Sequence, residues 1–136
     1  MNKTILKRIA NSLALNIQQT PMIGLLEGNL SMALYLYHYA KSNNLKSYSD
    51  MADSILDYTI EHYLKNVDRS FSSGLYGIGW TIWYMKRHCF VEISDDTFDD
   101  FETIVKQPYS SIDIDQDLNT KFPVFSKGLY CVQSGK

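Results

Sequence analysis

The chain of 136 residues has few of the features that define several protein classes. Its two cysteines, Cys89 and Cys131, are too few for a disulfide framework or an all-cysteine zinc site, which favours a reducing compartment. Thirteen basic side chains against fifteen acidic ones give a net charge of -2, so no general electrostatic attraction draws the chain to a polyanion. We therefore expect no nucleic-acid partner.

Long hydrophobic runs are also missing. The longest apolar stretch, residues 30–40, is far shorter than the roughly 18 residues that a membrane helix needs, and it contains Ser31 and His38. Near the start, polar residues interrupt the apolar segment that follows Lys3, and no small-residue cleavage site comes after it, which argues against a signal peptide. We expect no membrane partner and a cytoplasmic location.

The rest of the composition is that of an ordinary folded domain, with 45% hydrophobic and 21% charged residues, and the length fits a single domain over residues 1–136. Apolar residues recur at helical spacing and alternation with period two never persists, so the sequence predicts an all-α fold. The predicted helices cover about residues 3–17, 28–41, 48–66, 80–87 and 94–107.

The predicted helices alternate between two types. The first, third and fifth are amphipathic, and on the third we expect Asp53, Asp57 and Glu61 to face water. The second and fourth are apolar on nearly all sides, which predicts that they are buried and that Trp80 and Trp83 are largely hidden from solvent.

Glycine-leucine pairs occur near the start of the apolar helices at a nearly constant spacing. Gly74 follows Gly24 by 50 residues, and Gly128 follows Gly74 by 54. Such a period is typical of helical-hairpin repeats, in which an outer helix pairs with an inner helix and no repeat buries its apolar face alone. The chain stops at Lys136 before a third inner helix is complete. We therefore expect a fragment or a shortened relative, with residues 106–136 as a truncated third repeat or a cap.

The glycine-rich openings of the two apolar helices resemble those of a known family. Residues 24–28 (GLLEG) and 70–80 (SFSSGLYGIGW) are similar to the repeated inner-helix openings of lanthionine synthetase C-like proteins, and the likeness spans about residues 20–130. The resemblance implies a partial α/α toroid, an incomplete barrel of inner and outer helices. It also implies a peptide ligand, because the cyclase members add cysteine thiols to dehydrated serine or threonine in a precursor peptide.

The zinc site of that family has no counterpart in this sequence. Family members hold zinc with two cysteines and a histidine from tryptophan-cysteine and cysteine-histidine-glycine motifs late in the chain, and neither motif occurs here. The resemblance thus implies an incomplete lanthionine synthetase C-like protein, at most a binding or accessory module, with no catalytic residue, metal or cofactor. The alternative is a fragment of an enzyme, a peptide thioether cyclase or a carboxylate-dependent hydrolase, whose active site and any zinc ligands are completed by missing sequence or a partner chain.

Three residues are candidates for ligand binding at the barrel mouth: Glu27, Tyr76 and Trp80. Glu27 stands where a carboxylate can act as a general acid or base, but the helix dipole also favours an acid there, and Gly77 at the matching position supplies no second carboxylate. The aromatic rings either line a groove for a peptide or sugar or form the core. The core is favoured, because large rings at helical spacing supply most of the apolar area of such helices.

His88 and Cys89 are the one adjacent histidine-cysteine pair, which is the donor set of a soft zinc site or a cysteine nucleophile. The other cysteine is Cys131, and the remaining histidines lie on other predicted helices. We therefore interpret the pair as a helix-end histidine beside a buried thiol, and no metal site is predicted.

We predict that the chain forms a two-fold homodimer. A chain that ends just after Gly128 leaves the flank of the 80–87 helix without its next neighbour, and exposed apolar patches of this kind usually mark an interface. Light scattering coupled to size exclusion should give twice the monomer mass of 15.7 kDa. A strictly monomeric mass at high micromolar concentration would contradict the dimer and favour a cap formed by the segment after Pro108.

Overall fold

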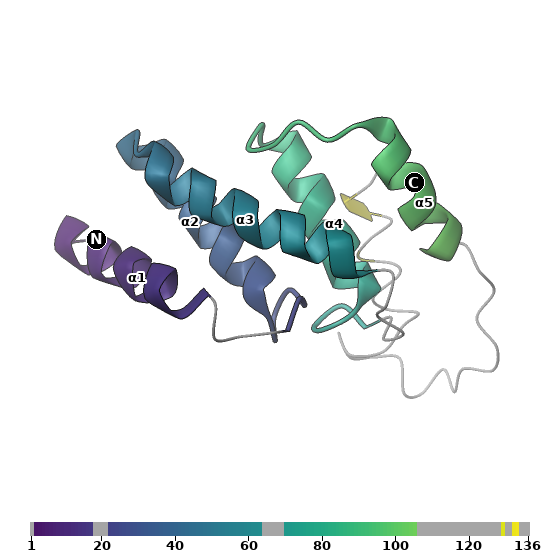
Figure 1. Cartoon of the computed structure of the whole chain (residues 1–136), viewed down its shortest axis with the longest axis horizontal. Helices are drawn as coiled ribbons and strands as arrows, with labels where there is room; N and C mark the ends of the chain where they lie inside the picture. The colour runs from purple at the N-terminus through teal and green to yellow at the C-terminus, as the bar shows by residue number, and fades with distance from the viewer. Residues whose placement is uncertain (1, 18–21, 64–69, 106–128, 130–131, 134–136) are drawn as a thin grey trace.

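The computed structural model describes residues 2–17, 22–63, 70–105, 129 and 132–133. Within these residues the chain is helical and has no strand, which confirms the all-α prediction (Figure 1). The helices are α1 (Lys3–Asn16), α2 (Asn29–Asn43), α3 (Lys46–His62), α4 (Leu75–Arg87) and α5 (Asp95–Val105). None of these helices is long and apolar enough to cross a membrane. The predicted third repeat falls almost entirely outside the described residues.

The hairpin of α2 and α3 holds the most extensive helix contact in the described part of the chain. Asn44 ends α2 in the left-handed conformation, with φ of 53°, and its N–H donates to the carbonyl oxygen of Ala40. The chain then reverses into α3, so the two helices lie antiparallel (Figure 1). Both contribute fully buried side chains to one core, among them Leu36 and Ala52.

A polar link joins the two helices of the hairpin at its edge. The hydroxyl of Tyr37, which is 2% exposed, donates to the carboxylate of Asp53 over 2.6 Å. Burial raises the pKa of Tyr37, and the hydrogen bond and charge of Asp53 raise it further, so the phenol remains a donor. Asp53, Asp57 and Glu61 are exposed, as predicted for the polar face of α3.

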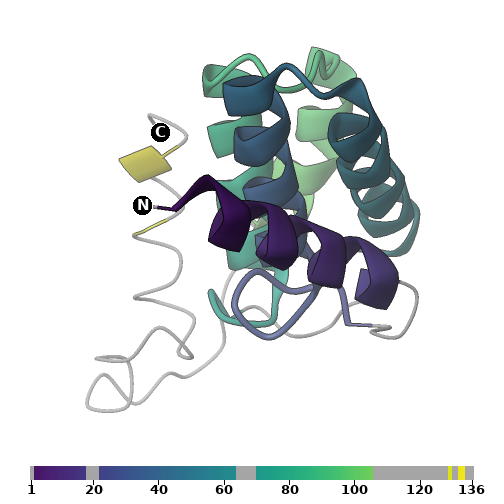
Figure 2. The same ribbon diagram turned by 90° about the vertical axis from the view of Figure 1, so that its left-hand side faces the viewer.

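Two tyrosine hydroxyls tie α1 to the hairpin, which it crosses on one side (Figure 2). Tyr35 of α2 donates to the carbonyl oxygen of Leu6 over 2.9 Å, and Tyr48 of α3 donates to Oδ1 of Asn11 over 2.6 Å. Ala10 is the fully buried residue of this helix. Large apolar side chains of α1 that stay exposed are Ile5, Ile9 and Leu15. The apolar stripe of α1 is therefore only partly covered.

α2 and α4 begin at the same end of the molecule, where the segments that precede them are hydrogen bonded to each other (Figure 1). The N–H groups of Leu26 and Glu27 donate to the carbonyl oxygen of Ser72 over 2.7 and 3.1 Å. Gly24 permits this approach, because a Cβ at that position would lie 2.5 Å from the Cα of Ser73. The glycine-rich openings therefore serve close packing.

The positions of the helix caps differ from the pairing of glycines that the predicted repeat assumes. Gly28 and Gly74 are the N-caps of α2 and α4, so Gly74 corresponds to Gly28 and not to Gly24. By the same register Glu27 corresponds to Ser73 and not to a glycine of α4. The segment 75–79 is the first part of α4 itself, because the backbone becomes helical directly after its glycine cap.

The predicted burial of the two apolar helices is wrong for one face of each. His38 is exposed, and Leu34 and Tyr35 on α2 are only partly buried. On α4, Trp80 and Trp83 are also partly buried, where the sequence predicts largely hidden rings. These side chains do touch other helices, since Tyr35 bonds to α1 and His38 bonds to Tyr84 of α4, but the contacts leave part of each side chain open to solvent.

We predict that the substitution Gly77→Ala lowers the free energy of unfolding by about 1–3 kcal/mol, as overpacking typically does. A Cβ at Gly77 would overlap the carbonyl oxygen of Phe71, which is backbone and cannot turn away. The loss comes despite the roughly 1 kcal/mol by which alanine is the better helix former. Urea unfolding followed by circular dichroism measures the change. The control Ser54→Ala, on the exposed face of α3, should stay within about 0.5 kcal/mol of the parent. An unchanged or raised stability for the Gly77 variant would show that the first turn of α4 does not pack this closely on the backbone of Phe71.

Candidate functional site

A row of partly exposed rings lies along the incompletely buried face of α4, here called the open face. It consists of Phe71, Trp80, Tyr84, His88 and Phe90, here called the ring row. Successive ring centroids lie 5.7, 5.3, 4.1 and 5.9 Å apart. Because none of the five side chains is fully buried, the ring row presents a continuous aromatic surface to solvent.

Helical spacing and one left-handed turn build the ring row. Trp80, Tyr84 and His88 recur every four residues and so share one face of α4. Cys89 follows with φ of 55°, a left-handed conformation that is uncommon for a residue with a side chain. The N–H of Phe90 then donates to the carbonyl oxygen of Met85 over 3.0 Å, which folds the Phe90 ring back beside the helix end.

His38 connects the ring row to α2. Its Nε2 lies 3.0 Å from the hydroxyl oxygen of Tyr84, and its ring centroid lies 4.8 Å from Phe90 and 6.1 Å from His88. Partial burial lowers the pKa of His38 below the ordinary value of 6.5, and the charges of His88 and Lys41 lower it further. The imidazole is therefore neutral near pH 7 and links the two helices through Tyr84.

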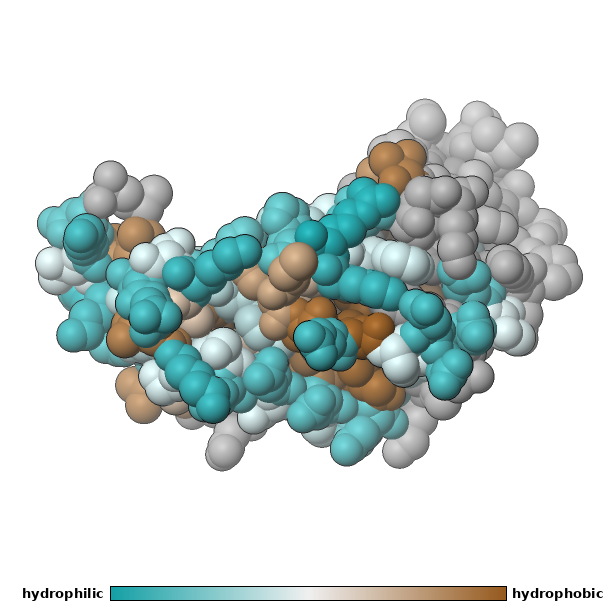
Figure 3. All heavy atoms as spheres, turned by 90° about the horizontal axis from the view of Figure 1, so that it is seen from above, coloured by the Kyte–Doolittle hydropathy of each residue, from teal (hydrophilic) through white to brown (hydrophobic). Residues whose placement is uncertain are grey.

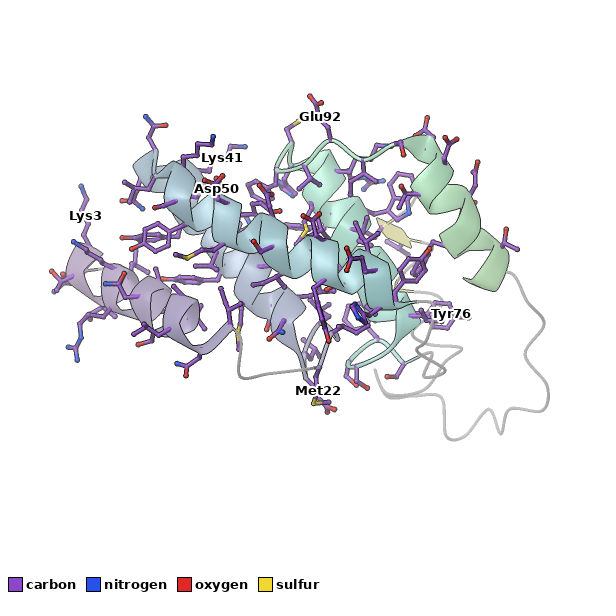
Figure 4. All side chains as sticks on the ribbon, viewed as in Figure 1. Lys3, Met22, Lys41, Asp50, Tyr76 and Glu92 are labelled. Carbon is purple, nitrogen blue, oxygen red and sulfur yellow. The ribbon has the colours of Figure 1, made fainter. Side chains whose placement is uncertain are left out.

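The three predicted site residues do not share one exposed surface. Glu27 is exposed at the opening of α2, where its N–H is bound to the carbonyl oxygen of Ser72. Tyr76, at the start of α4, is 1% exposed and belongs to the core (Figure 4). Trp80 alone of the three lies in the ring row. Their predicted role at a barrel mouth stays a prediction.

His38 and Phe90 belong to the site although neither is among the residues predicted for it. A single imidazole inside the otherwise apolar stretch 30–40 is the signal that marks His38. The position of Phe90 has no comparable signal, because it depends on the left-handed turn at Cys89, a conformation that side chains rarely adopt.

The interpretation of Cys89 as a buried thiol is wrong. Its thiol is free and exposed, because the left-handed turn carries the residue out beyond the end of α4. His88 stands at the helix end, as predicted, with its ring in the ring row. Among the residues that the structure describes, no three His, Cys, Asp or Glu side chains are grouped to hold a metal ion. Cys131 lies outside those residues.

The chain was compared with protein-family models, curated proteins and solved structures, and none of them matched it. The resemblance to lanthionine synthetase C-like proteins therefore rests on the two glycine-rich openings of α2 and α4. The ring row is the feature from which a function can be inferred.

We expect His38 to titrate below pH 6.5 in the folded chain, with its midpoint rising in Lys41→Gln, because one of the nearby positive charges is removed. Since the pKa is lower in the folded than in the unfolded chain, the unfolded chain takes up the proton first as the pH falls. The stability that neutral His38 contributes is complete above about pH 6.5 and is lost as the pH falls through the interval between the two pKa values. Proton-carbon NMR of the imidazole measures the midpoint. A midpoint at or above 6.5 would rule out the described environment.

Proposed function

We propose that this chain is a non-catalytic binding module that takes a peptide segment along the ring row. The observation that carries the proposal is the ring row itself, five rings in successive contact with none fully buried. Tryptophan and tyrosine are enriched where a few residues supply most of the binding free energy. Their rings contribute a large contact area and lose little side-chain entropy when a partner covers them.

The two ends of the ring row differ in chemistry, which gives a bound segment a direction. Phe71 and Trp80, near the start of α4, form an apolar end that suits a hydrophobic side chain. At the other end His38 and His88 add imidazole nitrogens, and both are exposed. A peptide with an apolar residue followed by hydrogen-bonding groups fits this order.

The resemblance to lanthionine synthetase C-like proteins supports a peptide as the class of ligand. It also supports a finer description of the fold as helical-hairpin repeats in a partial α/α toroid, in which α2 and α4 are inner helices and α3 is an outer one. The common starting end of α2 and α4, with α3 antiparallel between them in the chain, is compatible with that arrangement. In the same proposal the module works in the cytoplasm, where an exposed thiol stays reduced.

Selection of short random displayed peptides against the purified chain tests the proposal. We expect enrichment of peptides with aromatic or large apolar residues. Fluorescence anisotropy of a selected peptide should then show binding weaker by about tenfold or more to Trp80→Ala and to Tyr84→Ala, as expected when a central aromatic contact is truncated.

The matched control is Tyr58→Ala on α3. Tyr58 is 42% exposed and stacks on His62 with ring centroids 4.1 Å apart, so it is another exposed ring against an imidazole, but on the outer face of the hairpin. Its removal should leave the affinity of the selected peptide within about twofold, the range expected of a residue outside the contact. Equal losses of affinity in the control and in the Trp80 variant would contradict the proposal. So would selected peptides whose affinity is unchanged in both variants.

A further inference from the structure

A pocket of about 470 Å³ lies beside the ring row, where the end of α2, the start of α3 and the turn after α4 meet. Lys41 projects upward from the end of α2 in Figure 4, on the side of the molecule that Figure 3 shows from above. The side chains that decide the character of the pocket are Lys41, Asn44, Lys46, Ser49, Cys89 and Phe90.

Among the residues that the structure describes, two lysines and no carboxylate line this pocket. The ammonium group of Lys41 donates to the carbonyl oxygen of His88 over 3.2 Å and lies 5.2 Å from the ring centroid of Phe90. These two contacts hold one positive charge at the rim. Lys46 is exposed at the first residue of α3 and supplies the other. The pocket is therefore electropositive in a chain whose net charge is -2.

Two acids of α3 lie nearby without lining the pocket. The carboxylate of Asp53 accepts from the hydroxyl of Tyr37, a lining residue, over 2.6 Å, and Asp50 is exposed. The start of α3 adds to the positive potential, because its N-cap Leu45 provides no side-chain hydrogen bond to the first-turn N–H groups.

We propose that this pocket binds the anionic group, a carboxylate or a phosphate, of a small organic ligand. Lys41 and Lys46 pair with the anion, and Phe90 and Cys89 contact the remainder of the ligand. A pocket of about 470 Å³ exceeds by many times the roughly 30 Å³ that one water occupies in the liquid, so it has room for more than a bare ion. This site is distinct from the proposed peptide-binding function, since the two share only Phe90.

The exposed thiol of Cys89 allows the field inside the pocket to be measured directly. In a Cys131→Ser background, we compare the rates at which Cys89 reacts with a sulfonate-bearing and with a trimethylammonium-bearing methanethiosulfonate. Relative to the same ratio in urea, the anionic reagent should be favoured by about tenfold at low salt, and salt should reduce the preference. Lys46→Gln should lower the preference severalfold without removing any described hydrogen bond.

Binding is measured by NMR titration of the amides at the start of α3, with inorganic phosphate and acetate added separately. We expect saturable shifts for at least one of the two anions, which identifies the ligand group as a phosphate or a carboxylate, and loss of saturation in the double variant Lys41→Gln, Lys46→Gln. The control Lys3→Gln, Lys7→Gln changes the net charge equally on α1, outside the pocket, and should bind as the parent does.

Three results would overturn the proposal. They are a ratio of the two reaction rates that is the same in the folded chain as in urea, saturation by neither anion, and an equal loss in the α1 control. Each of these leaves the peptide selection on Trp80 and Tyr84 unaffected, so the two proposals fail separately.

Discussion

The carbonyl oxygen of Ser72, which accepts the N–H groups of Leu26 and Glu27, is the contact on which the arrangement of the molecule depends. It joins two segments nearly fifty residues apart and fixes α2 and α4 to a common starting end. The backbones can approach this closely because Gly24 has no side chain, since a Cβ there would meet the backbone of Ser73. With both helices starting from one fixed point, positions at similar heights along them face each other.

The ring row follows from that alignment. His38 comes ten residues after the N-cap of α2, and Tyr84 comes ten residues after the N-cap of α4, so the two meet over 3.0 Å. The helix rise of about 1.5 Å per residue places them equally far from the joined openings. A shift of one residue in either cap would separate the imidazole from the hydroxyl. The contact between the openings of α2 and α4 thus determines which side chains meet in the ring row, because both helices extend from that contact.

The sequence predicts the helices well, because periodic apolar residues determine both the element type and its polar side. The exposed acids of α3, Asp53 among them, follow from that periodicity alone. What covers an apolar face is a property of its neighbours, so the partial exposure of Trp80 and Trp83 was not predictable from their own helix. The exposure of the Cys89 thiol depends on the left-handed conformation of this one residue. The place of Phe90 in the site could not be predicted for the same reason. The apolar periodicity of the sequence therefore predicts the individual helices, whereas the candidate site depends on contacts between helices that the periodicity does not specify.

The attachment of α1 sets an order in which the structure comes apart. Two tyrosine hydroxyls, the fully buried Ala10 and three partly buried side chains hold this helix, whereas α2 and α3 share a continuous core. The three side chains are Leu6, Leu13 and Ile17. Hydrogen bonds of this kind contribute only about 1 kcal/mol each, so α1 can detach while the hairpin remains folded. In native-state hydrogen exchange we therefore expect the amides of α1 to open before those of α2 and α3. Detachment of α1 exposes the hydroxyls of Tyr35 and Tyr48. It leaves the hydrogen bonds between the openings of α2 and α4 in place, because α1 takes no part in them.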